Sequence, residues 1–334
     1  MAVTIKQIAK MSDVAPATVS LVMQDSPKVS KKTKERVLKI IDEMDYYPNN
    51  SGRLLKQGRT NNIAVLSSYF HGIFKMELVN GVETAIFNTP YRLSQFYAET
   101  GKEPEKCKEI LLGKIADAAM VICMNPEPRF MHKMRSSGKH IILIEDTLDG
   151  FPGVRFDNYE GAFTAVKYLA STGRKKIGIS VSNLRGHFLH SFVSDRMEGY
   201  KSALKDAGLS FNKENILVTP TYTYELGIET YRRYKESGIK LDAIFFASGD
   251  LCAAAFLKEA QKDGIKIPDD IAIIGFDNSI IAAVTTPGLT TVRQPAGDMG
   301  KKACEMAVSL LNGSEQFKEQ IITFKPELIK RESA

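Results

Sequence analysis

The chain has 334 residues, of which 43% are hydrophobic and 25% charged, a composition typical of globular proteins with two or three domains. Its net charge of +6 is uneven, because residues 1–60 hold eleven Lys and Arg against six acids, a net of +5, and the rest of the chain carries only +1. Since it shows neither a run of about eighteen apolar residues nor an apolar signal-peptide core, we expect a cytoplasmic protein with no membrane partner.

Two short helical patterns lie in the basic N-terminal segment, in TIKQIAKMSDVAPATVSLVM. Thr4 and Gln7 form a capping box for a first helix, and Ser12-Asp13-Val14 interrupts the apolar pattern. Pro16 then opens a second helix, where its missing N–H does no harm. Two short helices with a tight turn indicate a helix-turn-helix unit, whose second helix enters the DNA major groove. A solvated basic surface is the alternative explanation of the charge alone.

A third helix and a hinge follow. Ser30 is placed to cap a helix in which Val37, Ile40, Ile41 and Met44 recur at three- and four-residue steps. We therefore expect an all-α head over residues 1–48. Residues 49–60 predict a hinge helix or linker, which is short and contains Gly52 and so needs a partner to order it.

The body, residues 61–334, alternates apolar runs with helical stretches. The six runs are IAVL from Ile63, AAMVIC (118–123), HIILIE (140–145), KIGISV (176–181), LDAIFFA (241–247) and DIAIIGFD (270–277). Such runs predict parallel sheets covered on both faces. We expect two lobes, one over about 61–159 and 291–321 and the other over about 160–290 and 322–334, with Arg155-Phe156-Asp157-Asn158 as a connecting loop. Ligands would bind beyond the carboxyl ends of the strands, in a cleft between the lobes.

No catalytic or metal site is indicated. The four cysteines, Cys107, Cys123, Cys252 and Cys304, lack CxxC spacing and mostly have apolar neighbours, so we expect buried free thiols. The five histidines form no HExxH motif, and His187 with His190 is better explained as a structural loop. No GxGxxG, GxxxxGK[ST] or GxSxG motif occurs, so we expect neither a cofactor nor an enzyme.

Several ordered motifs resemble those of one family. TIKQIAKMSDVAPATVSLVMQDSPKVSKKTKERVLKIIDEMDYYPN resembles the head of the LacI/GalR family of bacterial transcription regulators, and NNSGRLLKQGRT resembles its hinge. DNYEGA, SDRMEGYKSAL, IKIPDDIAIIGFDN and PGLTTVRQP resemble further motifs of that family. The resemblance covers the whole chain. It implies an α/β protein with an N-terminal all-α helix-turn-helix head and a two-lobed periplasmic-binding-protein-like α/β effector domain.

The resemblance places the DNA-reading positions at the start of the second helix. These positions hold Pro16, Ala17, Thr18, Ser20 and Leu21. Because Leu21 stands where many relatives carry Arg and the first two side chains offer only apolar contacts, we expect weak direct readout, with Ser20 as the best hydrogen-bonding candidate.

Other positions resemble the family's contacts to the DNA backbone and minor groove. Thr4, Thr18, Ser30 and Asn49 match its phosphate contacts, although Thr4 and Ser30 are also explained as helix caps. Leu55 matches the leucine that wedges into the minor groove and kinks the operator, with packing in the dimer as the alternative.

The resemblance also places effector contacts in the cleft. Arg196 matches the family's ligand arginine, Asp277 the aspartate of GFD, and Tyr222 an aromatic that covers one ligand face. These groups suit a sugar's hydroxyls and its apolar face. Phe74 keeps the family's aromatic, while Lys75 replaces another.

Three cleft positions depart from the family pattern. Tyr69 stands for the usual Asp, Asp146 for a frequent Arg, and Gly249 for an Asn. The pocket therefore need not take an ordinary hexose. Asp146 and Asp277 together suit a ligand with an amine, unless Asp146 points to solvent or pairs with a local arginine.

The sequence thus predicts a homodimeric transcription regulator, most simply a repressor, that binds a palindromic double-stranded DNA operator. A sugar or related metabolite in the cleft would change how the lobes sit, and so the spacing of the two hinges. A solute-binding protein is the alternative, disfavoured by the DNA head and the missing secretion signal. A sugar-processing enzyme is disfavoured by the missing catalytic set.

Overall fold

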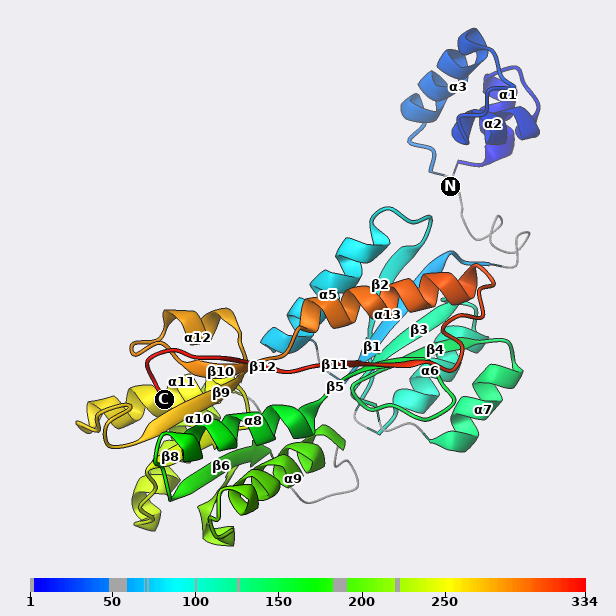
Figure 1. The fold of residues 1–334 in the computed structure, drawn as a ribbon. Helices are drawn as coiled ribbons and strands as arrows, with labels where there is room; N and C mark the ends of the chain where they lie inside the picture. The colour runs from blue at the N-terminus through cyan, green and yellow to red at the C-terminus, as the bar shows by residue number, and fades with distance from the viewer. Residues whose placement is uncertain are drawn as a thin grey trace. The chain divides into compact units, whose positions relative to one another are not determined.

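The computed structural model describes residues 3–47, 59–68, 70, 72–99, 101–124, 127–182, 191–219 and 223–334 (Figure 1). The chain forms two compact units, residues 1–60 and residues 61–334. None of the helices in these described ranges is long and apolar enough to cross a membrane.

Within its described residues 3–47, the first unit is a three-helix head. Its helices are α1 (Ile5–Met11), α2 (Pro16–Met23) and α3 (Lys31–Glu43). Ile8, Val19 and Val37 are fully buried between them. The head is therefore built as the apolar spacing predicts, with one buried residue or more from each helix.

Local chemistry fixes where these helices begin. The Thr4 N–H donates to Gln7 Oε1 at 2.8 Å, and the Gln7 N–H donates to Thr4 Oγ1 at 3.4 Å, which confirms the capping box. Asp13 adopts φ 49° in the turn between α1 and α2, and Pro16 is the first residue of α2. The Ser30 hydroxyl accepts from the Thr33 N–H at 3.3 Å, as its predicted capping role requires.

The second unit contains two six-stranded sheets, one in each lobe. The strand order in the first lobe is β11-β5-β4-β3-β1-β2, all parallel. These strands are β1 (Asn62–Ser67), β2 (Arg92–Tyr97), β3 (Ala118–Ile122), β4 (His140–Ile144), β5 (Gly153–Phe156) and β11 (Ile321–Phe324). The helices of this lobe are α5 (Ile73–Ile86), α6 (Glu103–Leu112), α7 (Pro128–Ser136) and α13 (Ala296–Leu311), and α5 and α13 lie side by side on one face of the sheet (Figure 1).

The second lobe repeats this design, with strand order β12-β10-β9-β8-β6-β7. Its strands are β6 (Ile177–Ser182), β7 (Ile216–Thr219), β8 (Ala243–Phe246), β9 (Ala272–Asp277), β10 (Thr290–Arg293) and β12 (Glu327–Ile329), of which only β12 runs antiparallel to its neighbour among these described pairs. Its helices are α8 (Asn158–Ser171), α9 (Ser191–Asp206), α10 (Tyr224–Ser237), α11 (Asp250–Lys262) and α12 (Ile280–Val284), with a 3₁₀ turn at Lys213–Asn215.

The six predicted apolar runs are strands β1, β3, β4, β6, β8 and β9, which occupy the interior of the two sheets. The other six strands were not predicted. Edge strand β2, RLSQFY, has no fully buried residue and so lacks an apolar run. The expected loop at 155–158 is wrong, because Arg155 and Phe156 belong to β5 and Asn158 begins α8.

The chain crosses between the lobes three times: after β5, after β10 and after β11. Since β10 pairs with β9 and β11 with β5, the lobe boundaries lie after Arg293 and after Phe324, and not at 291 and 321. The crossings touch one another, as the Asp157 N–H donates to the Phe324 carbonyl at 2.9 Å and Lys325 Nζ to Asp157 Oδ2 at 3.3 Å. The strand ends of both lobes are therefore held around a compact three-stranded junction.

The cysteines are free, as predicted. Cys107, Cys252 and Cys304 are buried, while Cys123 is half-buried after the end of β3. Burial raises the pKa of the Cys107, Cys123 and Cys252 thiols to about 12, so none of these three is a nucleophile near neutral pH.

Candidate functional site

The start of α2 is open to solvent in the head. Pro16 and Ala17 are exposed, and Thr18, Ser20 and Leu21 are half-buried. Ala15 precedes the helix without a capping side chain, so backbone N–H groups of the first turn remain for an anion. This end of the helix is available for contacts with the edges and phosphates of a nucleic acid.

Three of the predicted DNA contacts, Thr4, Ser20 and Ser30, have hydroxyl groups with intramolecular partners. Ser20 Oγ donates to the Pro16 carbonyl at 3.3 Å, which weakens its expected role as the best base reader. Thr4 Oγ1 and Ser30 Oγ cap their helices, so the capping explanation holds for both. Asn49 and Leu55 lie outside the described residues, as does most of the predicted hinge.

The backbone is unusual at the strand ends of the two lobes. Cys123 after β3, Glu145 after β4 and Asp277 at the end of β9 have φ values of 53°, 74° and 109°, and Gly249 after β8 has φ 97°. Non-glycine residues with positive φ are uncommon and gather at functional sites. These turns lie at the carboxyl ends of parallel strands, where α/β proteins bind ligands.

Arg196 of α9 is buried at the strand ends of the second lobe. Its Nε donates to Asn158 Oδ1 at 2.8 Å and its Nη1 to the Ala247 carbonyl at 2.7 Å. The guanidinium carbon lies 3.7 Å from the centre of the Phe276 ring, a cation–π contact. Nη2 has no hydrogen-bond partner among the described residues. Two hydrogen bonds therefore hold one edge of the guanidinium and the Phe276 ring covers one face, which leaves the Nη2 donors for a ligand.

Asp277 lies close to Gly249, which was predicted for the site, and to Asp250, which was not. A Cβ on Gly249 would come within 3.1 Å of Asp277 Oδ2, so the small residue leaves room beside this carboxylate. No described residue donates a hydrogen bond to the carboxylate of Asp277. Burial, and then the nearby Asp250 carboxylate, raise the pKa of Asp277 well above its usual value. Arg196, Gly249 and Asp277 are thus brought together as predicted.

Asp250, which received no role from the sequence, is a fully buried anchor. Its Oδ2 accepts from the Ser279 N–H at 2.7 Å and its Oδ1 from Thr291 Oγ1 at 2.5 Å. Burial raises its pKa to about 7 against these hydrogen bonds. It ties the start of α11 to β10 and to the segment after β9.

Asp146 does not point to solvent, which corrects one alternative left open by the sequence. It is 4% exposed, and its Oδ1 accepts from the N–H of Ser191 at 2.9 Å and from its hydroxyl at 2.7 Å. Asp146 follows β4 of the first lobe and Ser191 begins α9 of the second, so the contact joins the lobes. Asp146, one of the two carboxylates that the sequence suggested for binding a ligand amine, therefore already has partners within the chain.

The aromatic contacts are only partly described. Phe74 is half-buried on α5 and packs on the large apolar core. Its neighbour Lys75 is buried, with Nζ donating to Ser67 Oγ at 2.9 Å, and desolvation lowers its pKa. Tyr69 and Tyr222 lie outside the described residues, as do His187 and His190.

Sequence reasoning missed Glu145 and Gln294, and gave Asn158 no role beyond its motif. Glu145 Oε2 accepts from Asn158 Nδ2 and Oε1 from Gln294 Nε2, each at 2.9 Å. Burial raises the pKa of Glu145 to about 7, although the Arg196 charge opposes this. The three residues occur in the runs HIILIE, DNYEGA and PGLTTVRQP, but only the fold brings them together.

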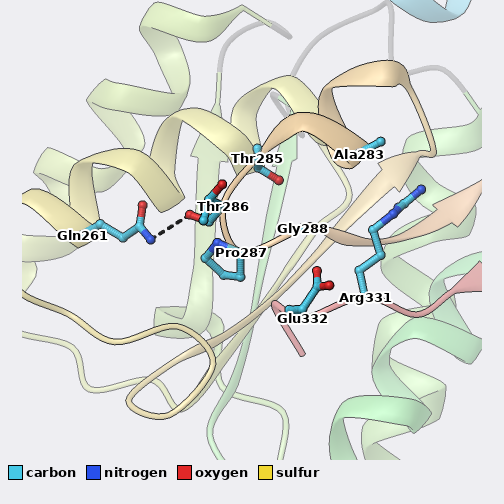
Figure 2. A pocket seen from close by; sticks show the side chains of 8 residues that line it. All are labelled: Gln261, Ala283, Thr285, Thr286, Pro287, Gly288, Arg331 and Glu332. Atoms are coloured by element: carbon cyan, nitrogen blue, oxygen red, sulfur yellow. Dashed lines mark hydrogen bonds between the residues drawn. The ribbon is translucent and has the colours of Figure 1, made fainter.

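A separate cavity of about 800 Å³ lies in the second lobe, at the end of α11 (Figure 2). Its lining consists of Gln261, Ala283, Thr285, Thr286, Pro287, Gly288, Arg331 and Glu332. The Gln261 amide donates to the Thr286 carbonyl at 2.8 Å, and Arg331 Nη2 donates to Asn278 Oδ1 at 2.8 Å. No predicted effector residue lines this cavity.

Metal chemistry finds no support in the described part of the chain. None of its His, Cys, Asp and Glu side chains forms a group of three or more that could hold a metal ion.

Comparisons with known proteins agree with this arrangement. Residues 4–49 match the family model described as bacterial regulatory proteins, lacI family, and residues 166–334 match that of a periplasmic binding protein-like domain. The chain is 30% identical over 333 residues, 99% of each protein, to the NTD biosynthesis operon regulator NtdR of Bacillus subtilis (strain 168). It is 31% identical over 318 residues, 93% of each, to catabolite control protein A of Priestia megaterium.

Solved structures give the same fold. The lac repressor dimer bound to operator and the anti-inducer ONPF superimposes with a TM-score of 0.84 at 18% identity, over 100% of this chain and 99% of the other. The complex of the transcriptional regulator CelR with cellobiose gives a TM-score of 0.73 at 25% identity, over 99% and 100%.

Proposed function

The chain belongs to the LacI family of bacterial regulatory proteins, and from this we propose that it represses transcription as a homodimer on a palindromic operator. Like its relatives, it is a DNA-binding regulator and not an enzyme. The single observation that carries the proposal is the pairing of a helix-turn-helix head with a two-lobed body in one chain. The body alone would equally suit a solute-binding protein.

Surface composition supports the DNA contact. Eight Lys and Arg side chains lie on the described head, and Lys6, Lys10, Lys28, Lys31 and Lys32 are all exposed. Two others are ion-paired, Lys34 with Asp25 at 2.6 Å and Lys39 with Glu43 at 3.8 Å. The exposed cations are free to neutralise phosphates, which is the main source of affinity for DNA. Thr4, Pro16, Ala17, Thr18, Ser20, Leu21, Ser30, Asn49 and Leu55 are the proposed contacts.

Exposed apolar side chains support a homodimer. Met76 on α5, Phe87 directly after it, Tyr97 on edge strand β2, and Ile280 and Val284 on α12 are each more than half exposed. Large apolar side chains on an edge strand and its neighbouring helix are costly unless another chain covers them. The second copy would also bring a second head for the other half of the operator.

The test of this function is a gel shift with a palindromic site from the DNA upstream of the gene. We expect dimer-dependent binding that weakens about a thousandfold between roughly 50 and 200 mM salt, as about six neutralised phosphates require. A scrambled site of the same length is the control. Binding that is absent, or equal on both DNAs, would reject the regulator and leave the solute-binding alternative.

We further propose that a small effector, a sugar or related metabolite, binds between the lobes. Arg196 and Asp277 supply the donors and acceptors, while Phe74, Asp146 and Gly249, together with Tyr69 and Tyr222, shape the site. The Nη2 donors of Arg196 and the carboxylate of Asp277 support this, because both lack partners among the described residues and lie at the same strand ends. Polar groups placed in this way at the strand ends of an α/β fold are available to a ligand.

Arg196→Ala should remove the thermal stabilisation given by the effector found in a screen of sugars and nucleosides. A ligand at a hundred times its dissociation constant stabilises the native state by about 2.7 kcal/mol, so the shift in wild type should be plain. Arg233→Ala, at an exposed site on α10, is the control. Circular dichroism would confirm that both variants fold. An unchanged shift in folded Arg196→Ala would place the effector elsewhere, for example in the cavity of Figure 2.

A further inference from the structure

The backbone and side chain of Glu145 are tightly constrained. It directly follows β4, is 5% exposed, and has φ 74°, in the left-handed region that a glutamate rarely adopts. Such a backbone conformation persists only where the surroundings fix it. Here the turn directs the side chain away from the first lobe's core and into the junction between the lobes, where its partners lie.

Both carboxylate oxygens of Glu145 meet side chains from the connections between the lobes. Asn158 begins α8, directly after the first crossing, and Gln294 lies in the second crossing, between β10 and α13. Each amide donates to a different oxygen of Glu145, at 2.9 Å. One residue of the first lobe thus holds two of the three crossings.

The same network continues to the effector arginine. The Asn158 amide nitrogen donates to Glu145 Oε2 at 2.9 Å and to the Phe156 carbonyl at 3.3 Å, and its oxygen accepts from Arg196 Nε at 2.8 Å. Because an amide cannot donate through its oxygen, the shorter, charged contact with Glu145 is the main interaction that fixes which way round Asn158 sits. The orientation of Asn158 then decides whether Arg196 Nε meets an acceptor or a second donor.

We propose that Glu145 is the positioning residue for Arg196, acting through Asn158 to hold the guanidinium with its Nη2 edge toward the effector. This proposal depends on the proposed function only for the identity of the ligand that Arg196 binds. It follows that a neutral Glu145 holds Asn158 less firmly, because the amide N–H then donates to an uncharged oxygen and no longer to a carboxylate. The Nε partner of the guanidinium is then less firmly held, and the guanidinium becomes more mobile.

The charged groups around Glu145 set when it becomes neutral. Burial, with a smaller effect from the Asp146 charge, raises the pKa of Glu145 to about 7. The Arg196 charge opposes this shift, because it stabilises the ionised carboxylate. The Glu145 charge also raises the pKa of Asp277 and that of the Cys123 thiol. Protonation therefore falls near neutral pH, and Asp277 must be controlled for.

The chemical reactivity of Arg196 tests the proposal without any effector. The full-length protein is treated with phenylglyoxal between about pH 6 and pH 8.5, and peptide mass spectrometry gives the modification rate of Arg196 relative to the exposed Arg129. In wild type the ratio should rise about tenfold as pH falls, the change expected from losing one hydrogen bond to a charged group. In Glu145→Gln the ratio should stay at the high value throughout.

Two further variants separate the explanations. Asp277→Asn should keep the wild-type pH profile, and Gln294→Leu, which leaves the Glu145 to Asn158 bond, should keep Arg196 protected. A flat wild-type profile, or a Glu145→Gln profile equal to that of wild type, would overturn the positioning role. The wild-type profile decides the matter even if Glu145→Gln fails to fold. Operator and effector binding are measured separately, so failure here would leave the proposed function standing.

Discussion

Gly81→Ala should lower the free energy of unfolding by about 3 kcal/mol, the upper range for forcing extra atoms into a packed core. A Cβ on Gly81 of α5 would collide with the backbone carbonyl of Gly297 on α13, and a Cβ on Gly300 would collide with that of Leu78. Backbone atoms cannot rotate away as a side chain can. The two helices, which lie side by side in Figure 1, would have to separate.

Gly297→Ala is the matched control, because its Cβ would lie 3.8 Å from the nearest atom, the Glu77 carbonyl oxygen. It should be neutral or stabilising by up to about 1 kcal/mol, the difference in helix propensity between glycine and alanine. Urea unfolding of both variants measures the effect. Equal stabilities would mean that α5 and α13 do not approach as closely as their glycines indicate.

Sequence reasoning found the parts of the fold that carry their signal locally. The buried central strands are uninterrupted apolar runs, and Thr4, Pro16 and Ser30 mark helix starts by their own side-chain chemistry. Strand β10 gave no such signal. Its four residues form a strand because β9 and β12 lie on either side, and that arrangement depends on the whole chain.

The candidate site divides in the same way. Arg196 and Asp277 were predicted because they fall in recognisable motifs, and Gly249 because it departs from the family pattern; the fold brings the three close together. Glu145 looks like the polar end of an apolar strand, and no local pattern reveals that its partners are Asn158 and Gln294. For Asp146 the sequence showed the departure from the family pattern, but it did not show that Ser191 would be the partner of this carboxylate.

Replacing Glu145 by glutamine should change how stability depends on pH. The native pKa of Glu145 is about 7 and the ordinary value is 4.5, so between these values the native state binds a proton that the unfolded state has lost. Stability therefore falls as pH rises through this window, by about 1.4 kcal/mol for each unit of pKa difference. The wild type should lose about 3 kcal/mol from this group between roughly pH 4.5 and pH 8.

Glu145→Gln lacks this titration, so the stability of the variant minus that of the wild type should rise by about 3 kcal/mol over the same window. Glutamine presents an N–H₂ group to one of the two amide donors, which adds a destabilisation that does not vary with pH. Because the Glu145 charge also raises the pKa of Asp277, the same comparison is made in the Asp277→Asn background. Urea unfolding at several pH values measures this difference. If the difference is flat, then Glu145 is ionised in the native state throughout, and the pH switch of Arg196 is lost with it.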